Sequence, residues 1–308
     1  MSGKVLVAAP RSFCAGVVRA IDIVEKLLER HGPPIYVRHE IVHNVHVVRD
    51  LESRGAVFVD SEEDVPEGAL VVLSAHGVAP QIYEKCAERG LEVVDAVCPL
   101  VSKVHAEARR YAAQGHRIAL VGHAGHVEVE GTMGEAPDSI VLVETPEDAQ
   151  ALEVEDGRSV AYLTQTTLSL DDTAEVVEAL RERFPDLVGP PSADICYATQ
   201  NRQDAVKTIC EQTSLVLVVG SKTSSNANRL VEVARSEGAD AYLIDDERDL
   251  DPAWLEGHQS VGLTAGASSP ELLVERVVSR LAELGFDERE DVQIAREDVF
   301  FRLPAELR

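Results

Sequence analysis

The sequence alternates regularly between short runs of β-branched residues and longer amphipathic stretches with helical periodicity. The run KVLVAAP at residues 4–10 is followed by VVRAIDIVEKLLERHG at 17–32, and the alternation continues as far as ELLVERVVSRLAELG at 271–285. Many of the helical stretches end in glycine, which is common just after the last residue of a helix. An alternation of strands and helices produces parallel sheets with crossover helices on their faces. The sequence therefore predicts an α/β protein.

Three cysteines each follow a short segment that ends in apolar residues. Cys14 follows VLVAAPRSF, Cys98 follows EVVDAV and Cys196 follows PPSADI, and each interval is about the length of one small α/β domain. Because α/β proteins bind ligands beyond the carboxyl ends of their strands, a three-lobed chain can bring these turns to one central point. Three thiolates there would bind an iron–sulfur cluster or a zinc ion. The alternative is that each cysteine only packs as a small apolar side chain.

The other two cysteines, Cys86 and Cys210, lie within helical patterns, and we expect them to be packing residues. Five cysteines spread over a long chain do not indicate a disulfide framework. None of them forms a CxxC pair, so a local zinc knuckle or a ferredoxin-type run of cysteines is excluded.

Small or polar hydrogen-bonding residues follow most of the other predicted strands. They are His43, His76, His126, Glu128, Thr166, Thr167, Ser224, Ser225, Asn226 and Ser268. Donors between a strand and a helix N-terminus can bind a phosphate group without a lysine. Any one of them has a simpler explanation as a helix cap or a structural histidine, but their recurrence favours an anion site. No GxxxxGK[ST] motif is present, which argues against hydrolysis of nucleoside triphosphates.

Charge and hydropathy restrict the partners. The chain has 54 acidic and 29 basic residues, and a net charge of −25 argues against nonspecific binding to nucleic acids. The longest apolar runs, such as LVLVV and ALVVL, are too short to span a bilayer, and the first twenty residues do not have the layout of a signal peptide. We therefore expect a cytoplasmic protein with no membrane or nucleic-acid partner.

Nine motifs between residues 10 and 270 carry a resemblance to a known family. They are PRSFCAGVVRAI, RHEIVHN, SAHGVAP, DAVCPLV, GHAGHVEVEGTMGE, LTQTTLSLDDT, DICYATQNRQ, SKTSSNANRL and TAGASSPE, and EDVFFRLPAEL follows near the C-terminus. In this order they resemble the 4-hydroxy-3-methylbut-2-enyl diphosphate reductases, the terminal enzymes of the non-mevalonate isoprenoid pathway. The set is far more specific than a single glycine motif.

The resemblance implies a fold and a cofactor. Three small α/β domains with parallel sheets would be arranged pseudo-threefold around a central [4Fe–4S] cluster. The domains would comprise residues 15–97, residues 98–195, and residues 1–14 together with 196–282, with 283–308 as a C-terminal tail. Cys14, Cys98 and Cys196 would bind three of the irons and leave the fourth open to the substrate oxygen.

The resemblance also implies the reaction, a reductive dehydroxylation to isopentenyl diphosphate and dimethylallyl diphosphate that needs two electrons and two protons. Side chains cannot supply such electrons, so the cluster would supply them. Glu128 would be the proton source, and Thr166 would lie near the substrate hydroxyl. The diphosphate would contact His43, His76, His126, Ser224, Ser225, Asn226 and Ser268, with Thr167 as a further candidate. The expected electron donor is a ferredoxin or a flavodoxin.

Four positions depart from the family pattern. The sequence has Ser12 where glycine is common, Val97 where threonine is common, Val127 where proline is common and Ala227 where serine is common. Val127 lies between His126 and Glu128, and unlike proline it does not fix the backbone φ angle at this position.

Two other functions use the same residues. One is an iron–sulfur lyase or isomerase that acts on a phosphorylated metabolite by Lewis-acid chemistry. The other is a non-catalytic iron–sulfur sensor, which would not need the Glu128 carboxyl group.

Overall fold

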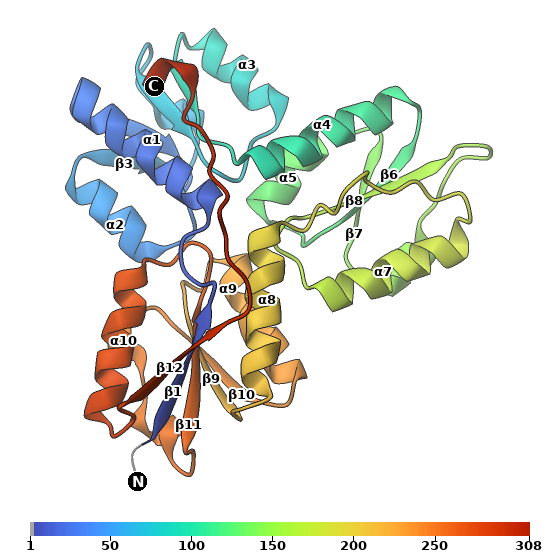
Figure 1. The fold of residues 1–308 in the computed structure, drawn as a ribbon. Helices are drawn as coiled ribbons and strands as arrows, with labels where there is room; N and C mark the ends of the chain where they lie inside the picture. Colours follow the sequence, from blue (N-terminus) through green and yellow to red (C-terminus); the bar gives the residue numbers. More distant parts are fainter. Residues whose placement is uncertain (1–2) are drawn as a thin grey trace. The chain divides into compact units, whose positions relative to one another are not determined.

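The chain forms three parallel β-sheets with helices between the strands, as the alternation of its sequence predicts. The computed structural model describes residues 3–308, and these divide into two units (Figure 1). The first unit takes in the chain up to Val18, together with His43–Arg49 and Tyr197–Phe300. The second takes in Arg19–Val42, Asp50–Cys196 and Phe301–Arg308. The prediction of an α/β protein with parallel sheets is confirmed.

The first unit contains a five-stranded sheet in the order β10-β9-β11-β1-β12, and every pairing in it is parallel. Its strands are β1 (Lys4–Ala9), β9 (Leu215–Val219), β10 (Asp240–Ile244), β11 (Ser260–Ala265) and β12 (Glu288–Gln293). β12 comes from the C-terminal segment of the chain and pairs with β1 along its whole length, from Lys4 opposite Glu288 to Ala9 opposite Gln293. The N-terminal strand is therefore enclosed between two strands from the end of the chain.

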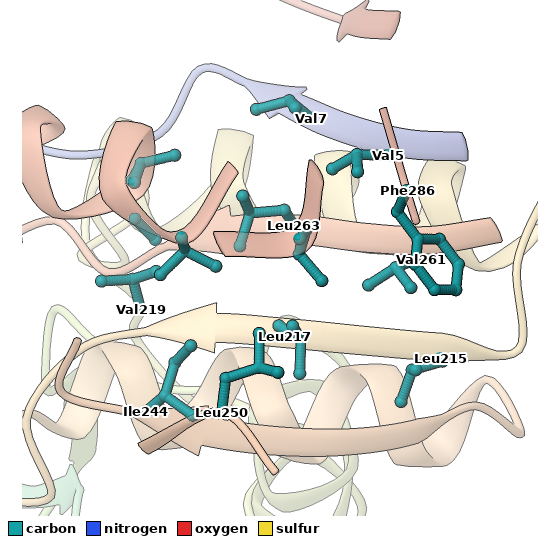
Figure 2. Packing of buried hydrophobic residues seen from close by; sticks show 14 of the residues in the cluster. Val5, Val7, Leu215, Leu217, Val219, Ile244, Leu250, Val261, Leu263 and Phe286 are labelled. Atoms are coloured by element: carbon teal, nitrogen blue, oxygen red, sulfur yellow. The ribbon is translucent and has the colours of Figure 1, made fainter. Parts of the chain in front are cut away.

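Both faces of the central strands of this sheet are buried, because helices cover each side. α8 (Tyr197–Cys210) and α9 (Ser225–Ser236) lie on one side, and α10 (Glu271–Glu283) lies on the other (Figure 1). Val5 and Val7 point toward the α10 side, as Figure 2 shows together with Leu217 and Leu263. The intervening Leu6 packs with α8 and α9 on the opposite side. This two-residue alternation follows from the pleat of a strand.

The second unit contains two parallel sheets. One has the order β3-β2-β4-β5, with strands Ala56–Val59, Ile35–Arg38, Leu70–Leu73 and Glu92–Asp95. The other has the order β7-β6-β8, with strands Ile140–Val143, Arg117–Val121 and Val160–Thr164. The helices associated with the first of these sheets are α1 (Ala15–His31), α2 (Val45–Ser53) and α3 (Pro80–Glu88), of which α1 and α2 begin in the first unit.

The three-stranded sheet also has helices on both faces. Val104 of α4 (Pro99–Ala113) and Val129 of α5 (Val127–Gly134) pack with Leu120. Val176 of α7 (Leu170–Arg183) packs on the opposite face with Val121 and with α6 (Pro146–Ala151). Short 3-10 turns at Glu62–Asp64, Glu247–Asp249, Pro252–Leu255 and Ala305–Leu307 complete the elements. Within residues 3–308, no helix is both long and apolar enough to cross a bilayer.

Candidate functional site

The turn that carries Cys14 in the first unit is held by hydrogen bonds on both sides. The backbone N–H of Cys14 donates to the carbonyl of Ala267 at 3.1 Å, and α1 begins at the next residue. Ser12 has a φ of 59°, in the left-handed region that favours glycine. Its Oγ donates to Glu271 at 2.6 Å. The left-handed backbone explains why the resemblance leads us to expect glycine at this position, and the hydrogen bond to Glu271 helps to stabilise the serine.

An ion pair between the buried Arg202 and the partly exposed Glu297 supports the same turn. Arg202 of α8 is completely buried, and its guanidinium donates to the carbonyl of Ser12 at 2.6 Å and to Glu297 at 2.9 Å. It also donates to the carbonyl of Ala198 at 2.9 Å. A buried charge is tolerated only when it is paired and hydrogen-bonded. Arg202 therefore ties α8 and the C-terminal segment to the backbone two residues before Cys14.

The polar residues after β9 and β11 meet at one edge of the first sheet. Ser224 caps α9 by accepting from the N–H of Ala227 at 3.3 Å, and Ser225 is the first residue of that helix. Asn226 accepts from the N–H of Ala267 at 2.8 Å and donates to Thr199 at 3.3 Å. These contacts bring the β9 and β11 turns together.

Ser268 links the same edge to the segment that carries His43. Its Oγ donates to the His43 carbonyl at 2.9 Å, and the His43 side chain is partly exposed. The first unit thus brings together the predicted anion-binding residues His43, Ser224, Ser225, Asn226 and Ser268, beside the Cys14 turn. Thr199, which joins this network through Asn226, was not singled out from the sequence.

Glu128 is the central polar residue of the second unit. Its side chain is buried, with 4% of its surface exposed. Oε1 accepts from the backbone N–H of Thr166 at 2.6 Å, and Oε2 accepts from the Thr166 hydroxyl at 3.0 Å. Burial raises the pKa of Glu128 to about 7, although the two hydrogen bonds from Thr166 favour the ionised form. A carboxyl group in this environment can both hold and release a proton near neutral pH.

The helix that carries Glu128 begins at a histidine cap. Nδ1 of His126 accepts from the N–H of Glu128 at 3.2 Å, so the cap stabilises α5 although Val127 replaces the usual proline at its first position. The His76 ring lies edge-on to the His126 ring, with their centroids 6.3 Å apart, and Nδ1 of His76 is 3.2 Å from Oγ of Ser74. The predicted residues His76, His126, Glu128 and Thr166 therefore gather in this unit.

Cys98 and Cys196 are tied to this group through their backbones. The N–H of Cys98 donates to the carbonyl of Ala75 at 3.0 Å, next to His76. The N–H of Cys196 donates to the carbonyl of Thr166 at 3.1 Å. Thr167, the remaining candidate, accepts from the side-chain amide of Gln165 at 2.9 Å.

The chemistry of the three predicted cysteine ligands fits an iron–sulfur cluster. Cys14, Cys98 and Cys196 each directly precede a helix, where the helix N-terminus stabilises a thiolate, and each is partly exposed. Burial raises the pKa of Cys86, and it raises the pKa of Cys210 to about 11, so both of these remain thiols.

Cys14 belongs to the first unit, whereas Cys98 and Cys196 belong to the second. Within residues 3–308, no group of three or more His, Cys, Asp or Glu side chains is placed to hold a metal ion. The convergence of the three cysteines on one cluster stays a prediction.

The sequence patterns did not single out several residues that support the site. Arg19 donates to the carbonyl of Val97 at 2.9 Å, so its cation lies beside the Cys98 turn. Arg202 and Glu297 hold the Cys14 turn, and His105 of α4 lies 2.8 Å from Glu135 at the end of α5. Arg202 and His105 lie inside helical patterns, where spacing alone does not distinguish a buried charge from an exposed one. The only available signal was that Arg202 belongs to the motif DICYATQNRQ.

Comparisons with known proteins agree with the fold and the motifs. A family model described as LytB protein matches residues 5–282. The chain is 59% identical over 306 residues to a 4-hydroxy-3-methylbut-2-enyl diphosphate reductase of Acidothermus cellulolyticus, with 99% of this chain and 90% of the relative covered. It is 58% identical to the protein of the same name from Mycolicibacterium paratuberculosis, with 99% and 92% covered.

Two solved structures are also similar. One is the E-1-hydroxy-2-methyl-but-2-enyl-4-diphosphate reductase from Plasmodium falciparum, with a TM-score of 0.97 and 40% identity over 100% of this chain and 97% of that one. The other is an (E)-4-hydroxy-3-methyl-but-2-enyl diphosphate reductase, with a TM-score of 0.65 and 32% identity over 91% of this chain and 99% of that one.

Proposed function

This chain belongs to the LytB family, and we propose that it reduces 4-hydroxy-3-methylbut-2-enyl diphosphate to isopentenyl diphosphate and dimethylallyl diphosphate. The C–O bond of the allylic hydroxyl group breaks, two electrons enter the carbon skeleton, and the hydroxyl group leaves as water after taking up one proton. A second proton adds to either end of the allylic system, which accounts for two isomeric products. The high identity to named reductases over the whole chain makes it an oxidoreductase of the non-mevalonate pathway.

The observation that carries this proposal is the buried pair of Glu128 and Thr166. With a pKa of about 7, the Glu128 carboxyl is about half protonated at neutral pH. The Thr166 hydroxyl lies 3.0 Å from it and is placed to orient a substrate hydroxyl and pass a proton toward it. A protein that only binds a phosphate has no need of a buried proton donor.

The polar edge of the first unit supports a diphosphate site. Ser224, Asn226 and Ser268 are small, buried side chains with rigid hydrogen-bond partners, and the N-terminus of α9 adds a partial positive charge. His43 from the first unit, with His76 and His126 from the second, would add donors, and protonated imidazoles would be favoured by the negative diphosphate. This arrangement offers an anion a local site on a chain whose net charge is −25.

Cys14, Cys98 and Cys196 would hold a [4Fe–4S] cluster, and their thiolates are the soft ligands that such clusters use. When bound, the cluster would pass on two electrons received one at a time from an external donor, and it would offer one open iron as a Lewis acid. The protein's own contribution is to fix the three cysteine turns, exclude water around Glu128 and bind the diphosphate. We further propose a ferredoxin or flavodoxin as the electron donor and the cytoplasm as the location.

An anaerobic assay with a reduced viologen mediator tests the reaction. A reductase oxidises two equivalents of a one-electron mediator for each diphosphate product formed. A Lewis-acid lyase or isomerase converts its substrate without consuming electrons, and a sensor converts nothing. Turnover without oxidation of the mediator contradicts the proposal.

Serine substitutions test the cofactor. Cys14→Ser, Cys98→Ser and Cys196→Ser are each expected to lose iron and the visible absorption of the cluster. Cys210→Ser is the matched control, because Cys210 is also partly exposed but lies at the end of a helix rather than before one. Full iron content and activity in Cys196→Ser would refute the three-cysteine ligand set.

A further inference from the structure

The segment that leads to Cys196 is neither helix nor strand. It runs from residue 189 to residue 196, between a single parallel bridge at Val188 and the start of α8 at Tyr197. Most of its residues are at least partly exposed. A segment of this kind holds a side chain in one place only if other elements fix its backbone. The position of Cys196 therefore depends on contacts from outside the segment.

Lys103 of α4 provides three such contacts. Its Nζ donates to the carbonyl of Ser192 at 2.8 Å, to the carbonyl of Ala193 at 3.0 Å and to Oδ1 of Asp194 at 3.1 Å. A lysine ammonium group has three N–H donors, so it can satisfy these three consecutive residues at once. Two of the acceptors are backbone carbonyls, and the contacts therefore fix the path of the chain itself.

Asp194 connects this segment to the end of β8. Its side chain is completely buried, and Oδ2 accepts from the backbone N–H of Thr164 at 3.0 Å. Burial raises the pKa of Asp194, while the hydrogen bonds from Thr164 and Lys103 favour the carboxylate. Two residues further on, the N–H of Cys196 donates to the carbonyl of Thr166 at 3.1 Å. The segment is thus fixed beside the threonine that is proposed to pass a proton to the substrate.

A second residue of α4 holds the other end of the segment. The hydroxyl group of Tyr111 donates to the carbonyl of Gly189 at 2.6 Å. Tyr111 lies about two helical turns after Lys103, and the buried Glu107 lies between them at a spacing of four residues from each. One side of α4 therefore fixes the segment near its start and again just before Cys196.

The same helix begins at Cys98. Cys98 is the N-cap residue of α4, and its carbonyl accepts from the N–H of Ser102 at 3.0 Å, directly before Lys103 in the chain. Lys103 is thus connected to Cys98 through the first turn of the helix and to Cys196 through the three hydrogen bonds of its ammonium group. Ordering a long lysine side chain costs conformational entropy, which a freely solvated lysine does not lose.

We propose that Lys103 is a positioning residue that fixes the turn of Cys196 relative to that of Cys98, and so prepares both thiolates to bind the iron–sulfur cluster. The inference rests on the proposed function, in which both cysteines are cluster ligands. It gives a role to the buried Asp194 and to the three hydrogen bonds of Lys103, none of which takes part in the proposed reaction.

The test replaces Lys103 by methionine, which is similar in length but has no donor. The full-length protein is prepared without iron, and hydrogen exchange is followed by mass spectrometry of the peptides that contain Thr164 and Cys196. In Lys103→Met the N–H of Cys196 is expected to exchange about tenfold faster than in the wild type, because the segment has lost hydrogen bonds from a charged donor. This reading does not depend on the cluster or on activity.

The protein reconstituted with iron and sulfide gives a second reading. Lys103→Met is expected to lose iron to a chelator about ten- to a hundredfold faster, which is the usual cost of removing a group that orients a metal ligand. The visible circular dichroism of the bound cluster is also expected to change, because this signal depends on how the ligands are placed. If Lys103 only stabilised the fold, neither quantity would change in samples that denaturant titration shows to be folded.

Lys85→Met is the matched control. Lys85 belongs to the same unit and its Nζ lies 3.1 Å from the buried Glu62, but it is part of α3. It is expected to leave the exchange at Cys196 and the loss of iron unchanged. The double variant Lys103→Met/Asp194→Asn repeats the test if the single variant does not fold, because asparagine removes the charge that would be left buried without its cation.

The outcomes separate this inference from the proposed function. If Cys196 N–H exchanges at the wild-type rate in the folded variant, the inference is overturned. It is also overturned if exchange is faster but iron is retained as in the wild type, because the contacts then do not serve the cluster. The proposed function fails instead on the mediator assay or on full iron content in Cys196→Ser, and neither measurement involves a change at Lys103.

Discussion

Replacing Glu128 by glutamine has opposite effects on activity and stability. Glutamine has nearly the shape of a protonated glutamate and still accepts the hydrogen bond that Thr166 N–H donates to the side chain at 2.6 Å. It has no acidic proton, however. Loss of a general acid lowers turnover by roughly a hundred- to ten-thousand-fold, and the cluster and substrate binding are expected to remain.

The effect on stability follows from the raised pKa. Burial raises the pKa of Glu128 from 4.5 to about 7, so between these two pH values the folded protein binds more protons than the unfolded chain. The free energy of unfolding therefore falls as the pH rises through this window. At 1.36 kcal/mol per pKa unit, the ionised carboxyl destabilises the folded protein by about 3 kcal/mol at pH 8. Glu128→Gln removes this penalty and is more stable than the wild type at pH 8, but not at pH 4.

Two measurements on the same samples test the predicted loss of turnover and the predicted gain in stability at pH 8. Single-turnover kinetics, with iron content determined in parallel, report the chemical step. Denaturant unfolding at pH 4 and pH 8 reports the stability. Glu130→Gln is the matched control, because Glu130 lies two residues further along α5 and is exposed, and it changes neither quantity. The reasoning is refuted if Glu128→Gln turns over at the wild-type rate, or if it is less stable than the wild type at pH 8. A fast Glu128→Gln beside an inactive Glu130→Gln would mean that the proton donor is the other glutamate.

Three further predictions concern the surroundings of the site. Asn226→Ala is expected to weaken competitive inhibition by inorganic pyrophosphate about tenfold and to leave the iron content intact. The reason is that a hydrogen bond to a charged group contributes about 1.5–3 kcal/mol. Unchanged inhibition in the double variant Asn226→Ala/Ser268→Ala contradicts the anion site. Arg202→Met removes the hydrogen bonds to the carbonyl of Ser12 and to the partly exposed Glu297, and it is expected to lower the free energy of unfolding by about 1–3 kcal/mol, measured by denaturant titration, with loss of iron from the Cys14 side. Normal iron content and stability would show that Arg202 does not hold the turn. Thr166→Val removes a hydrogen bond that lowers the pKa of Glu128, so the alkaline limb of the pH–rate profile is expected to move to higher pH. If the limb stays in place or moves to lower pH, the Thr166 hydroxyl does not stabilise the ionised Glu128.

The fold could be predicted from the sequence because its signals are local. The short apolar run in KVLVAAP and the helical period in VVRAIDIVEKLLERHG each depend on neighbours within a few residues, and their alternation along the chain predicts the parallel sheets. The segment HVEVEG was ambiguous, because as an extended strand it would point Glu128 and Glu130 to the same side. The His126 cap makes it a helix, and the helix buries Glu128 and exposes Glu130.

The supporting residues could not be predicted in the same way. Arg202 lies in a polar stretch of α8 that is typical of a solvent-facing helix, but its partner Ser12 is 190 residues away along the chain. His105 likewise lies 2.8 Å from Glu135 and packs against Gly77, which belong to other segments of the chain. Such contacts exist only after the sheets have formed, and without a rule for pairing distant polar residues no single-sequence pattern indicates them.

The pairing of β12 with β1 has a consequence for biosynthesis. The ribosome releases the N-terminal strand first, yet that strand finds its neighbours only when β11 and β12, close to the C-terminus, have emerged. Most of the second unit is a continuous stretch, Asp50–Cys196, that leaves the ribosome well before them, and domains generally fold as units during synthesis. We expect the turns of Cys98 and Cys196 to be formed early and that of Cys14 last. With the proposed three-cysteine ligand set, a ribosome-bound chain that lacks β12 would be unable to retain iron, and loading of the proposed cluster would wait for the completed polypeptide.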